Sequence, residues 1–321
     1  MRSKIIIDTD PGIDDAQAIA FAIAHPEIEL LGLTTVFGNG TVEVTTNNAL
    51  TLLDIFGAPE VPVAMGASRP LVQDRLPAPD FVHGADGMGN LHLPSPSNEA
   101  VKETAAEFIV RTVNEHIGEV SLITIGPLTN IAQALELDSE LASKTKQLIA
   151  MGGTVVAPGN VTPVAEANFI CDPHAADLVL GEDWPASIVG LDVTLATHLY
   201  DSVFKIIKQQ IGSVGEFLWE SSRFYVDFYA RELAQDSNHR YTPMHDASAL
   251  VYLVQAELFE TISGPARVVP DGLAVGQLIL DRMAGSYAFD YWQNRPTVQA
   301  AIEVDGTAVR KVFLETLLNY F

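Results

Sequence analysis

Four carboxylates crowd together near the start of the chain, in the stretch IIIDTDPGIDD: Asp8, Asp10, Asp14 and Asp15. Like charges this close repel one another, and apart from Lys4 no basic residue adjoins them, so their grouping needs a compensating partner. Carboxylate oxygens are the ligands that hard divalent cations prefer, and a bound cation would remove the repulsion. The spacing therefore predicts a Ca²⁺ or Mg²⁺ site.

Other interpretations of the stretch explain less of it. In an EF-hand loop starting at Asp8, the sixth and twelfth positions would be Gly and Glu, but Ile13 and Ile19 stand there. A strand-end aspartate pair of the phosphatase type, which binds Mg²⁺, fits DTDPG but leaves Asp14 and Asp15 without a role. Helix capping accounts for one of these two carboxylates, but not for four.

The elements around the stretch indicate where it lies. Strand-length apolar runs cover 4–8, 28–38, 61–67, 120–126, 146–153 and 186–194, and helical patterns cover 14–26, 42–57, 98–118, 128–137 and 171–182. This alternation indicates an α/β fold with a mostly parallel open sheet and helices on both faces. Ligands of such sheets bind beyond the carboxyl ends of the strands, and the acidic stretch directly follows the first one.

The last third of the chain shows a different pattern. Residues 200–260 read as mainly helical, 261–305 as small antiparallel C-terminal strands, and 307–321 as a terminal helix. No linker-like segment divides the sequence, so we expect a single domain over residues 1–321.

Composition excludes several classes of partner. Acidic residues number 41 against 18 Lys and Arg, a net charge of -23, which disfavours nucleic acid and anionic membranes. Cys171 is the only cysteine, so an intramolecular disulfide is impossible and a cysteine-based zinc site is not expected. The N-terminus lacks a secretory apolar region, and no apolar run approaches the roughly 18 residues of a membrane span. We expect a soluble, cytoplasmic protein.

The stretch DTDPGIDDAQAI resembles the N-terminal signature of the nucleoside hydrolases, the inosine–uridine-preferring family that cleaves the N-glycosidic bond of ribonucleosides. Further motifs follow in the family's order and spacing: TTVFGN (34–39), VHGADGMGN (82–90), IGPLTNIAQAL (125–135), MGG (151–153), GNVTPVAEANFICDPHAA (159–176) and MHDASAL (244–250). Many separated motifs in order are a specific signal.

The resemblance implies a role for individual residues. The Ca²⁺ ligands would be the carboxylates of Asp10, Asp15 and Asp246 and the backbone carbonyl of Ile125. The residues that match positions gripping the ribose hydroxyls are Asp14, Asn39, Asn160, Glu166 and Asn168. His245 would recognise or protonate the leaving base, since its ordinary pKa range permits that. The resemblance also implies a homodimer or homotetramer.

The expected reaction is hydrolysis of a ribonucleoside to free nucleobase and ribose, as in purine or pyrimidine salvage. Asp10 would activate a metal-bound water as general base, and nearby carboxylates would stabilise the oxocarbenium character of the ribosyl ring. Two alternatives stay open: an Mg²⁺-dependent phosphatase-like hydrolase, and a non-catalytic nucleoside or ribose binder on the same scaffold.

Aromatic and histidine residues elsewhere are candidates for the base side of the site. His83 precedes a Gly-rich loop, residues 84–89, that could close over the substrate as a lid. Tyr225 and Tyr229 are candidates to line the base pocket, whereas Phe224 and Phe228 fit a core stripe. Asp8 and Asp192 are expected to support the site from behind, and the base preference stays open.

Overall fold

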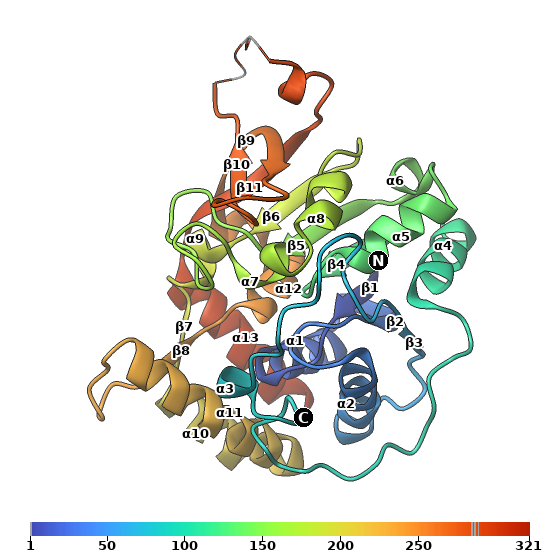
Figure 1. Cartoon of the computed structure of the whole chain (residues 1–321). Coiled ribbons are helices and arrows are strands. Elements are labelled where there is room, and N and C mark those ends of the chain that lie inside the picture. Colours follow the sequence, from blue (N-terminus) through green and yellow to red (C-terminus); the bar gives the residue numbers. More distant parts are fainter. Residues whose placement is uncertain (1, 284, 286, 288) are drawn as a thin grey trace.

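A nine-stranded sheet crosses the centre of the computed structural model, which describes residues 2–283, 285, 287 and 289–321 (Figure 1). The strand order is β10-β9-β11-β6-β5-β4-β1-β2-β3. The parallel strands are β1 (Ser3–Thr9), β2 (Ile28–Thr35), β3 (Val63–Met65), β4 (Val120–Thr124), β5 (Gln147–Met151), β6 (Ala186–Val189) and β11 (Thr297–Val304). Antiparallel strands β9 (Phe259–Val268) and β10 (Leu278–Leu280) complete one edge. The mostly parallel open sheet that the sequence predicts is confirmed.

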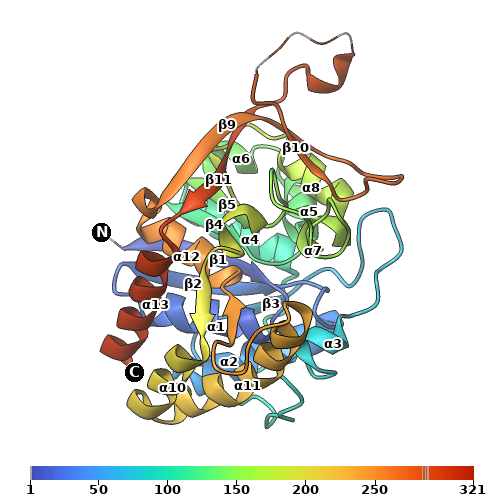
Figure 2. The ribbon, with the colours of Figure 1, turned by 90° about the vertical axis from the view of Figure 1, so that its left-hand side faces the viewer.

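Helices cover both faces of this sheet (Figure 2). One layer consists of α1 (Ile13–Ala24), α2 (Val42–Ile55), α10 (Asp201–Gln210), α11 (Gly212–Glu232), α12 (Asp246–Val254) and α13 (Gly306–Tyr320). The other consists of α4 (Ala105–Glu115), α5 (Thr129–Leu137), α6 (Leu141–Lys144) and α8 (Pro173–Val179). The remaining elements are the short helices α3 (Asp80–His83), α7 (Ala167–Cys171) and α9 (Leu191–Thr194) and a two-stranded sheet, β7 (His198–Tyr200) with β8 (Tyr241–Pro243). Of these, α9 and β7 add buried side chains to the first core, and α7 adds one to the second.

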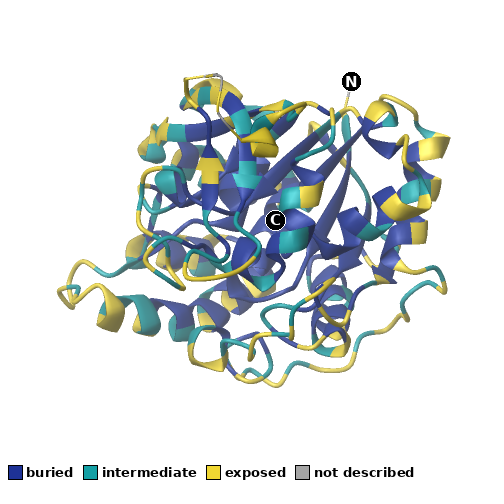
Figure 3. Cartoon of the chain, turned by 45° about the horizontal axis from the view of Figure 1, so that its top comes forward, coloured by how far each residue is buried: buried dark blue, intermediate teal, exposed yellow. Residues whose placement is uncertain are grey.

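The alternation of side chains along each strand creates two separate cores. Ile5 and Ile7 of β1 pack with the α1 layer, whereas Ile6 between them packs with the α4 layer. Because both faces are covered, the strands stay apolar throughout, and Figure 3 shows the sheet buried and the outer helix faces exposed. No helix in the described part of the chain combines the length and apolarity that crossing a membrane would require.

Several element boundaries differ from the sequence expectation. The helix expected over 98–118 starts only at Ala105, because the Thr104 and Glu107 side chains form a capping box there. The strand expected over 186–194 ends at Val189, and α9 follows it directly. The helix expected over 171–182 is α8, which starts at Pro173 with Asp172 as its cap and is preceded by a separate helix, α7. The antiparallel C-terminal strands are present and extend the main sheet.

Candidate active site

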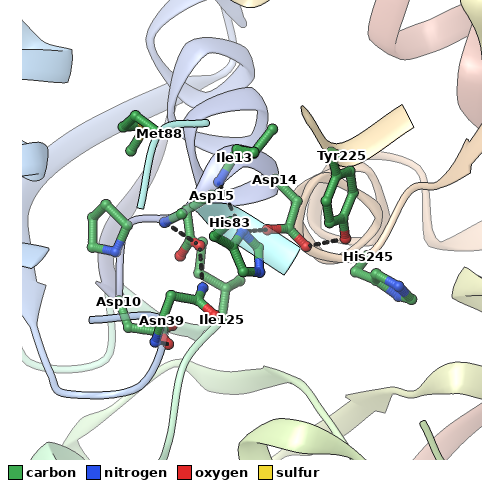
Figure 4. Close-up of polar contacts among 12 residues, drawn as sticks. Asp10, Ile13, Asp14, Asp15, Asn39, His83, Met88, Ile125, Tyr225 and His245 are labelled. Carbon is green, nitrogen blue, oxygen red and sulfur yellow. Dashed lines mark hydrogen bonds and ion pairs between the residues drawn. The ribbon is translucent and has the colours of Figure 1, made fainter. Parts of the chain in front are cut away.

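A cavity of about 400 Å³ opens beyond the carboxyl ends of the parallel strands. Of the residues predicted from the sequence, these line it: Asp14, Asn39, His83, Ile125, Asn160, Glu166, Asn168, Tyr225, Tyr229, His245 and Asp246. Asp10 and Asp15 lie behind this lining, where both bond to Asn39 (Figure 4). The fold thus gathers the predicted site residues from distant parts of the sequence around one cavity.

The carboxylate of Asp15 is held on three sides. Oδ1 accepts the Thr9 hydroxyl at 2.5 Å, and Oδ2 accepts the backbone N–H of Gly12 at 2.8 Å and the Asn39 side-chain N–H at 3.1 Å. The bond from Gly12 belongs to the N-terminal cap of α1, so helix capping explains part of the role of Asp15. These three donors fix the carboxylate at the start of α1.

Asp10 follows β1 and keeps one oxygen free. Oδ2 accepts the backbone N–H of Asn39 at 2.8 Å, while Oδ1 is buried and has no hydrogen-bond partner among the described residues. A Cβ atom on Gly38 would lie 1.9 Å from Oδ2, and one on Gly126 would lie 2.6 Å from Oδ1. The carboxylate is therefore packed between two glycine backbones, and its unpartnered oxygen requires water or a ligand.

Three buried carboxylates form the cluster that could hold a metal ion. One oxygen each from Asp14, Asp15 and Asp246 lies within 4.8 Å of the others. The family resemblance implies Asp10, Asp15 and Asp246 as the metal-binding carboxylates. The cluster in the structure contains Asp14 instead of Asp10. Burial first, and then repulsion from neighbouring carboxylates, raises the pKa of Asp246, of Asp15 and of Asp10 above the ordinary range. A cation in the cluster would counter both effects.

The opposite wall is built on α7 and the end of β4. Asn168 donates from Nδ2 to the carbonyls of Ile125 and Met151, both at 3.1 Å. Glu166 caps α7 by accepting the N–H groups of Asn168 and Phe169, and it also accepts that of Gly153. Burial raises the pKa of Glu166 to about 7 despite these donors. A protonated Glu166 would offer both a donor and an acceptor to a sugar hydroxyl.

Asn160 lies at the rim of the same wall. Its Oδ1 accepts the backbone N–H of Ala167 at 3.1 Å. This bond joins the loop that carries Asn160 to the first turn of α7, so Asn160 and Asn168 both face the cavity from one unit.

Histidine and tyrosine side chains close the base side of the cavity. Tyr225 donates to Asp14 Oδ2 at 2.9 Å, and Tyr229 contacts His245 Nε2 at 2.9 Å. His83 accepts the backbone N–H of Ile13 on Nδ1 at 3.2 Å, so it sits over the start of α1. Burial lowers the pKa of His245 to about 4. Burial therefore favours the neutral form of this imidazole.

Two aromatic residues of α11 line the cavity in different ways. Tyr225 lies in the cavity wall, is fully buried, and donates its hydroxyl proton to Asp14. Phe228 is not confined to the core, because it lines the cavity and its ring lies 5.9 Å from that of Phe81. The helical spacing of aromatics on α11 does not reveal this, since the cavity lies along the same helix face as the core.

Support residues that the sequence does not single out lie behind the site. Asn130 donates to Asp8 Oδ1 at 2.7 Å, and Thr34 donates to the same oxygen at 2.6 Å, which ties β1 to β2 and α5. Asn48 donates to the carbonyls of Pro11 and Asp86, which joins the Gly-rich loop to the acidic stretch. Asn130 lies within the motif at 125–135, but neither the motif nor the residue type reveals these contacts.

Asp192 has a structural role. Its carboxylate accepts the backbone N–H groups of Val155, Val156 and Ala157 at 2.7 to 2.8 Å. It therefore holds the loop after β5 against α9, as expected for a residue that supports the site from behind.

Known proteins resemble this chain along nearly its whole length. Residues 5–311 match the family described as inosine-uridine preferring nucleoside hydrolase. The chain is 39% identical over 318 residues to the probable uridine nucleosidase 1 of Oryza sativa subsp. japonica, which covers 99% of this chain and 97% of the rice protein. A solved plant nucleoside hydrolase superposes with a TM-score of 0.93 at 33% identity, covering 99% of both chains. A purine-preferring ribonucleoside hydrolase from Gardnerella vaginalis gives 0.90 at 31% identity, covering 98% of both chains.

Proposed function

This chain belongs to the inosine-uridine preferring nucleoside hydrolase family and hydrolyses the N-glycosidic bond of ribonucleosides, and on that premise we propose that it does so with bound Ca²⁺ and with Asp10 as general base. The observation that carries the proposal is the free, buried oxygen of Asp10 beside the cluster of Asp14, Asp15 and Asp246. A general base needs an oxygen that no protein donor already occupies.

The donor set fits a hard cation. Asp10, Asp15, Asp246 and the carbonyl of Ile125 are the proposed ligands, and all are oxygen donors. Ca²⁺ takes six to eight oxygens in flexible geometry, which leaves room for a sugar diol and water. When bound, the ion would make a coordinated water easier to deprotonate and would hold the sugar hydroxyls.

The chain's own groups account for the rest of the reaction. Asp10 takes a proton from the attacking water as the bond from water oxygen to C1′ forms. The bond from C1′ to the base breaks, and its electron pair leaves with the base. Buried carboxylates stabilise the positive charge that develops on the ribosyl ring. We propose that Asp14, Asn39, Asn160, Glu166 and Asn168 hold the ribose.

We propose uridine as the preferred substrate. The rice relative that matches almost the whole chain is named a probable uridine nucleosidase. The fold alone does not decide the base, because the Gardnerella enzyme superposes closely and is purine-preferring. We infer that the preference for one nucleobase over another depends on the side chains at the base side of the cavity, such as Phe81, Phe228 and Tyr229.

A reducing-sugar assay over uridine, cytidine, inosine, adenosine and guanosine, with and without chelator, tests the proposal. We expect ribose release without added phosphate, fastest from uridine, and loss of release after chelation. Equal release with and without bound metal would refute the role of Ca²⁺. Turnover of a phosphomonoester with Mg²⁺ but of no nucleoside would select the phosphatase alternative, and nucleoside binding without turnover would select the binder.

We also propose that residues 1–321 form one domain, that the protein works in the cytoplasm in nucleoside salvage, and that it associates as a homodimer or homotetramer. The support is the family resemblance together with the acidic charge, which disfavours nucleic acid and membrane partners. Light scattering coupled to size-exclusion chromatography tests the association directly, and a monomer at micromolar concentration would refute it.

A further inference from the structure

A buried threonine stands behind His245 on the side away from the cavity. Thr194 ends α9, is fully buried, and contacts His245 Nδ1 through its hydroxyl at 2.8 Å. The other ring nitrogen, Nε2, lies 2.9 Å from the hydroxyl of Tyr229, which borders the cavity. Thr194, His245 and Tyr229 thus form a line of two hydrogen bonds that runs from the protein interior to the base side of the site.

The burial of the Thr194 hydroxyl fixes the direction of these two hydrogen bonds. His245 Nδ1 is the only hydrogen-bond partner of the Thr194 hydroxyl among the residues that the structure describes. If Nδ1 carried the ring proton, the Thr194 proton would be buried without an acceptor, which is costly. If Thr194 donates to Nδ1, the ring proton sits on Nε2 and points at the Tyr229 oxygen. The Tyr229 hydroxyl keeps its own proton in this arrangement, and its other neighbours are the cavity and the hydroxyl of Tyr225.

We propose that Thr194 is a positioning residue that holds His245 in the tautomer protonated on Nε2, so that the hydroxyl of Tyr229 presents its proton to the departing nucleobase. His245 then acts through Tyr229, since its Nε2–H supports the tyrosine oxygen while that oxygen's proton is shared with the base. The two hydrogen bonds in series spread the negative charge of the leaving group. This inference rests on the proposed function and deepens it by assigning the groups that meet the leaving base.

The surrounding backbone allows Thr194 to be changed without loosening the segment that carries His245. The N–H of Met244 donates to the Thr197 carbonyl at 2.8 Å, and β7 pairs with β8 through His198 and Pro243. These contacts join α9 to the start of α12 independently of the Thr194 hydroxyl. Thr197 offers a matched control, because it is equally buried and its hydroxyl bonds to the Val193 carbonyl at 3.1 Å, away from His245.

The experiment compares Thr194→Val, Thr194→Ser and Thr197→Val on two substrates at one pH. One is uridine, whose base needs help to leave, and the other is an activated aryl riboside whose leaving group needs no proton. We expect Thr194→Val to lower kcat for uridine by about fivefold to tenfold, the effect of one lost hydrogen bond, with KM and the aryl riboside little changed. Thr194→Ser should restore the rate, and Thr197→Val should match the wild type.

A second readout reports the tautomer itself. Nitrogen-15 NMR of histidine-labelled protein should show His245 protonated on Nε2 in the wild type and in Thr194→Ser, and a mixture of tautomers in Thr194→Val. Equal slowing of both substrates, unchanged uridine turnover, or a wild-type proton on Nδ1 would each overturn the inference. A wild-type protein that cleaves neither substrate would instead overturn the proposed function, so the two failures are distinguishable.

Discussion

The hydroxyl of Tyr225 donates to Asp14 Oδ2 at 2.9 Å and so joins α11 to the first turn of α1, although the two residues stand 211 positions apart. This bond occupies one oxygen of the carboxylate and leaves Oδ1 buried with no hydrogen-bond partner among the described residues. The free oxygen is the one that remains for a sugar hydroxyl or a cation. A tyrosine that the sequence suggests for the base pocket thus orients Asp14, the residue that we propose to hold the ribose.

Replacing this tyrosine tests that relationship. In Tyr225→Phe the carboxylate of Asp14 loses a fixed donor, and we expect KM for uridine to rise about tenfold, as for a lost hydrogen bond to a charged group. Steady-state kinetics measure the change. Tyr252→Phe is the control, because Tyr252 is also buried but bonds to Ser187 and Gln299. Equal effects of the two substitutions would contradict a specific role for Tyr225.

Asp10→Asn separates catalysis from binding. The amide cannot accept the water proton, so we expect kcat for uridine to fall by about a thousandfold, within the range of general base catalysis. Uridine binding, measured by isothermal titration calorimetry, should persist at saturating Ca²⁺, because the other proposed ligands, Asp15, Asp246 and the Ile125 carbonyl, are unchanged. Asp54→Asn, at a half-buried carboxylate that bonds to Ser97, should leave the rate unchanged. An Asp10→Asn protein with more than a tenth of wild-type activity would rule out the role of Asp10.

Metal removal should affect stability as well as activity. The buried carboxylates repel one another without a cation, so Ca²⁺ should raise Tm, with about 2.7 kcal/mol of stabilisation when its concentration is 100 times Kd. Chelation should lower Tm and stop uridine hydrolysis, and Mg²⁺ should restore less of both because it demands stricter octahedral geometry. Thermal scans at graded Ca²⁺ measure this. Asp246→Asn should abolish most of the shift, and a full shift in that variant would argue against the cluster as the site.

The pH dependence of stability should reveal buried Glu166. Its pKa is raised from 4.5 to about 7 by burial, so the folded chain binds more protons than the unfolded chain between these values. The stabilisation from protonated Glu166 is complete below pH 4.5 and is lost as pH rises to about 7. In Glu166→Gln, which imitates the protonated form, the metal-free protein should lose less stability over this window. Parallel urea-unfolding curves for the two proteins from pH 4.5 to 7 would refute the shift.

Asn130 should matter for stability rather than for chemistry. Its side chain bonds to Asp8, to the Thr35 carbonyl and to the N–H of Ala67, all in the buried interior. Asn130→Ala removes all three bonds and leaves Asp8 with the Thr34 hydroxyl alone, and we expect a loss of about 3 kcal/mol in unfolding free energy. Urea denaturation measures it. Asn114→Ala on the exposed face of α4 should change stability by less than about 0.5 kcal/mol, and a similar small loss at Asn130 would be evidence against the network.

Much of the fold is predictable because its signals are local. Apolar runs and helical periodicity locate β1, α1, β4 and α5 closely, since parallel strands buried on both faces stay apolar along their length. The boundaries that differ depend on side-chain caps, such as Thr104 before α4 and Asp172 before α8. A capping side chain can start a helix about one turn away from the point where the periodic apolar pattern begins. The pattern alone therefore does not fix the first residue of the helix.

The site is predictable as a set of residues, but not as a set of contacts. Asp14, Asn168 and His245 line the cavity as expected. That Tyr225 engages Asp14, or that Thr194 stands behind His245, depends on how α9 and α11 pack onto α1 and α12. Such pairings join residues far apart in the chain, and a single sequence carries no signal of them.

The carboxylate cluster draws on distant parts of the chain, with Asp14 and Asp15 at the start of α1 and Asp246 at the start of α12. During synthesis on the ribosome, Asp14 and Asp15 are made early, and Asp246 is added only after most of the chain. A truncated or stalled chain would therefore keep its crowded negative charges but could not complete a cation site. Hydrolytic activity would then appear only when nearly the whole polypeptide has been made, which keeps unfinished chains from consuming nucleosides.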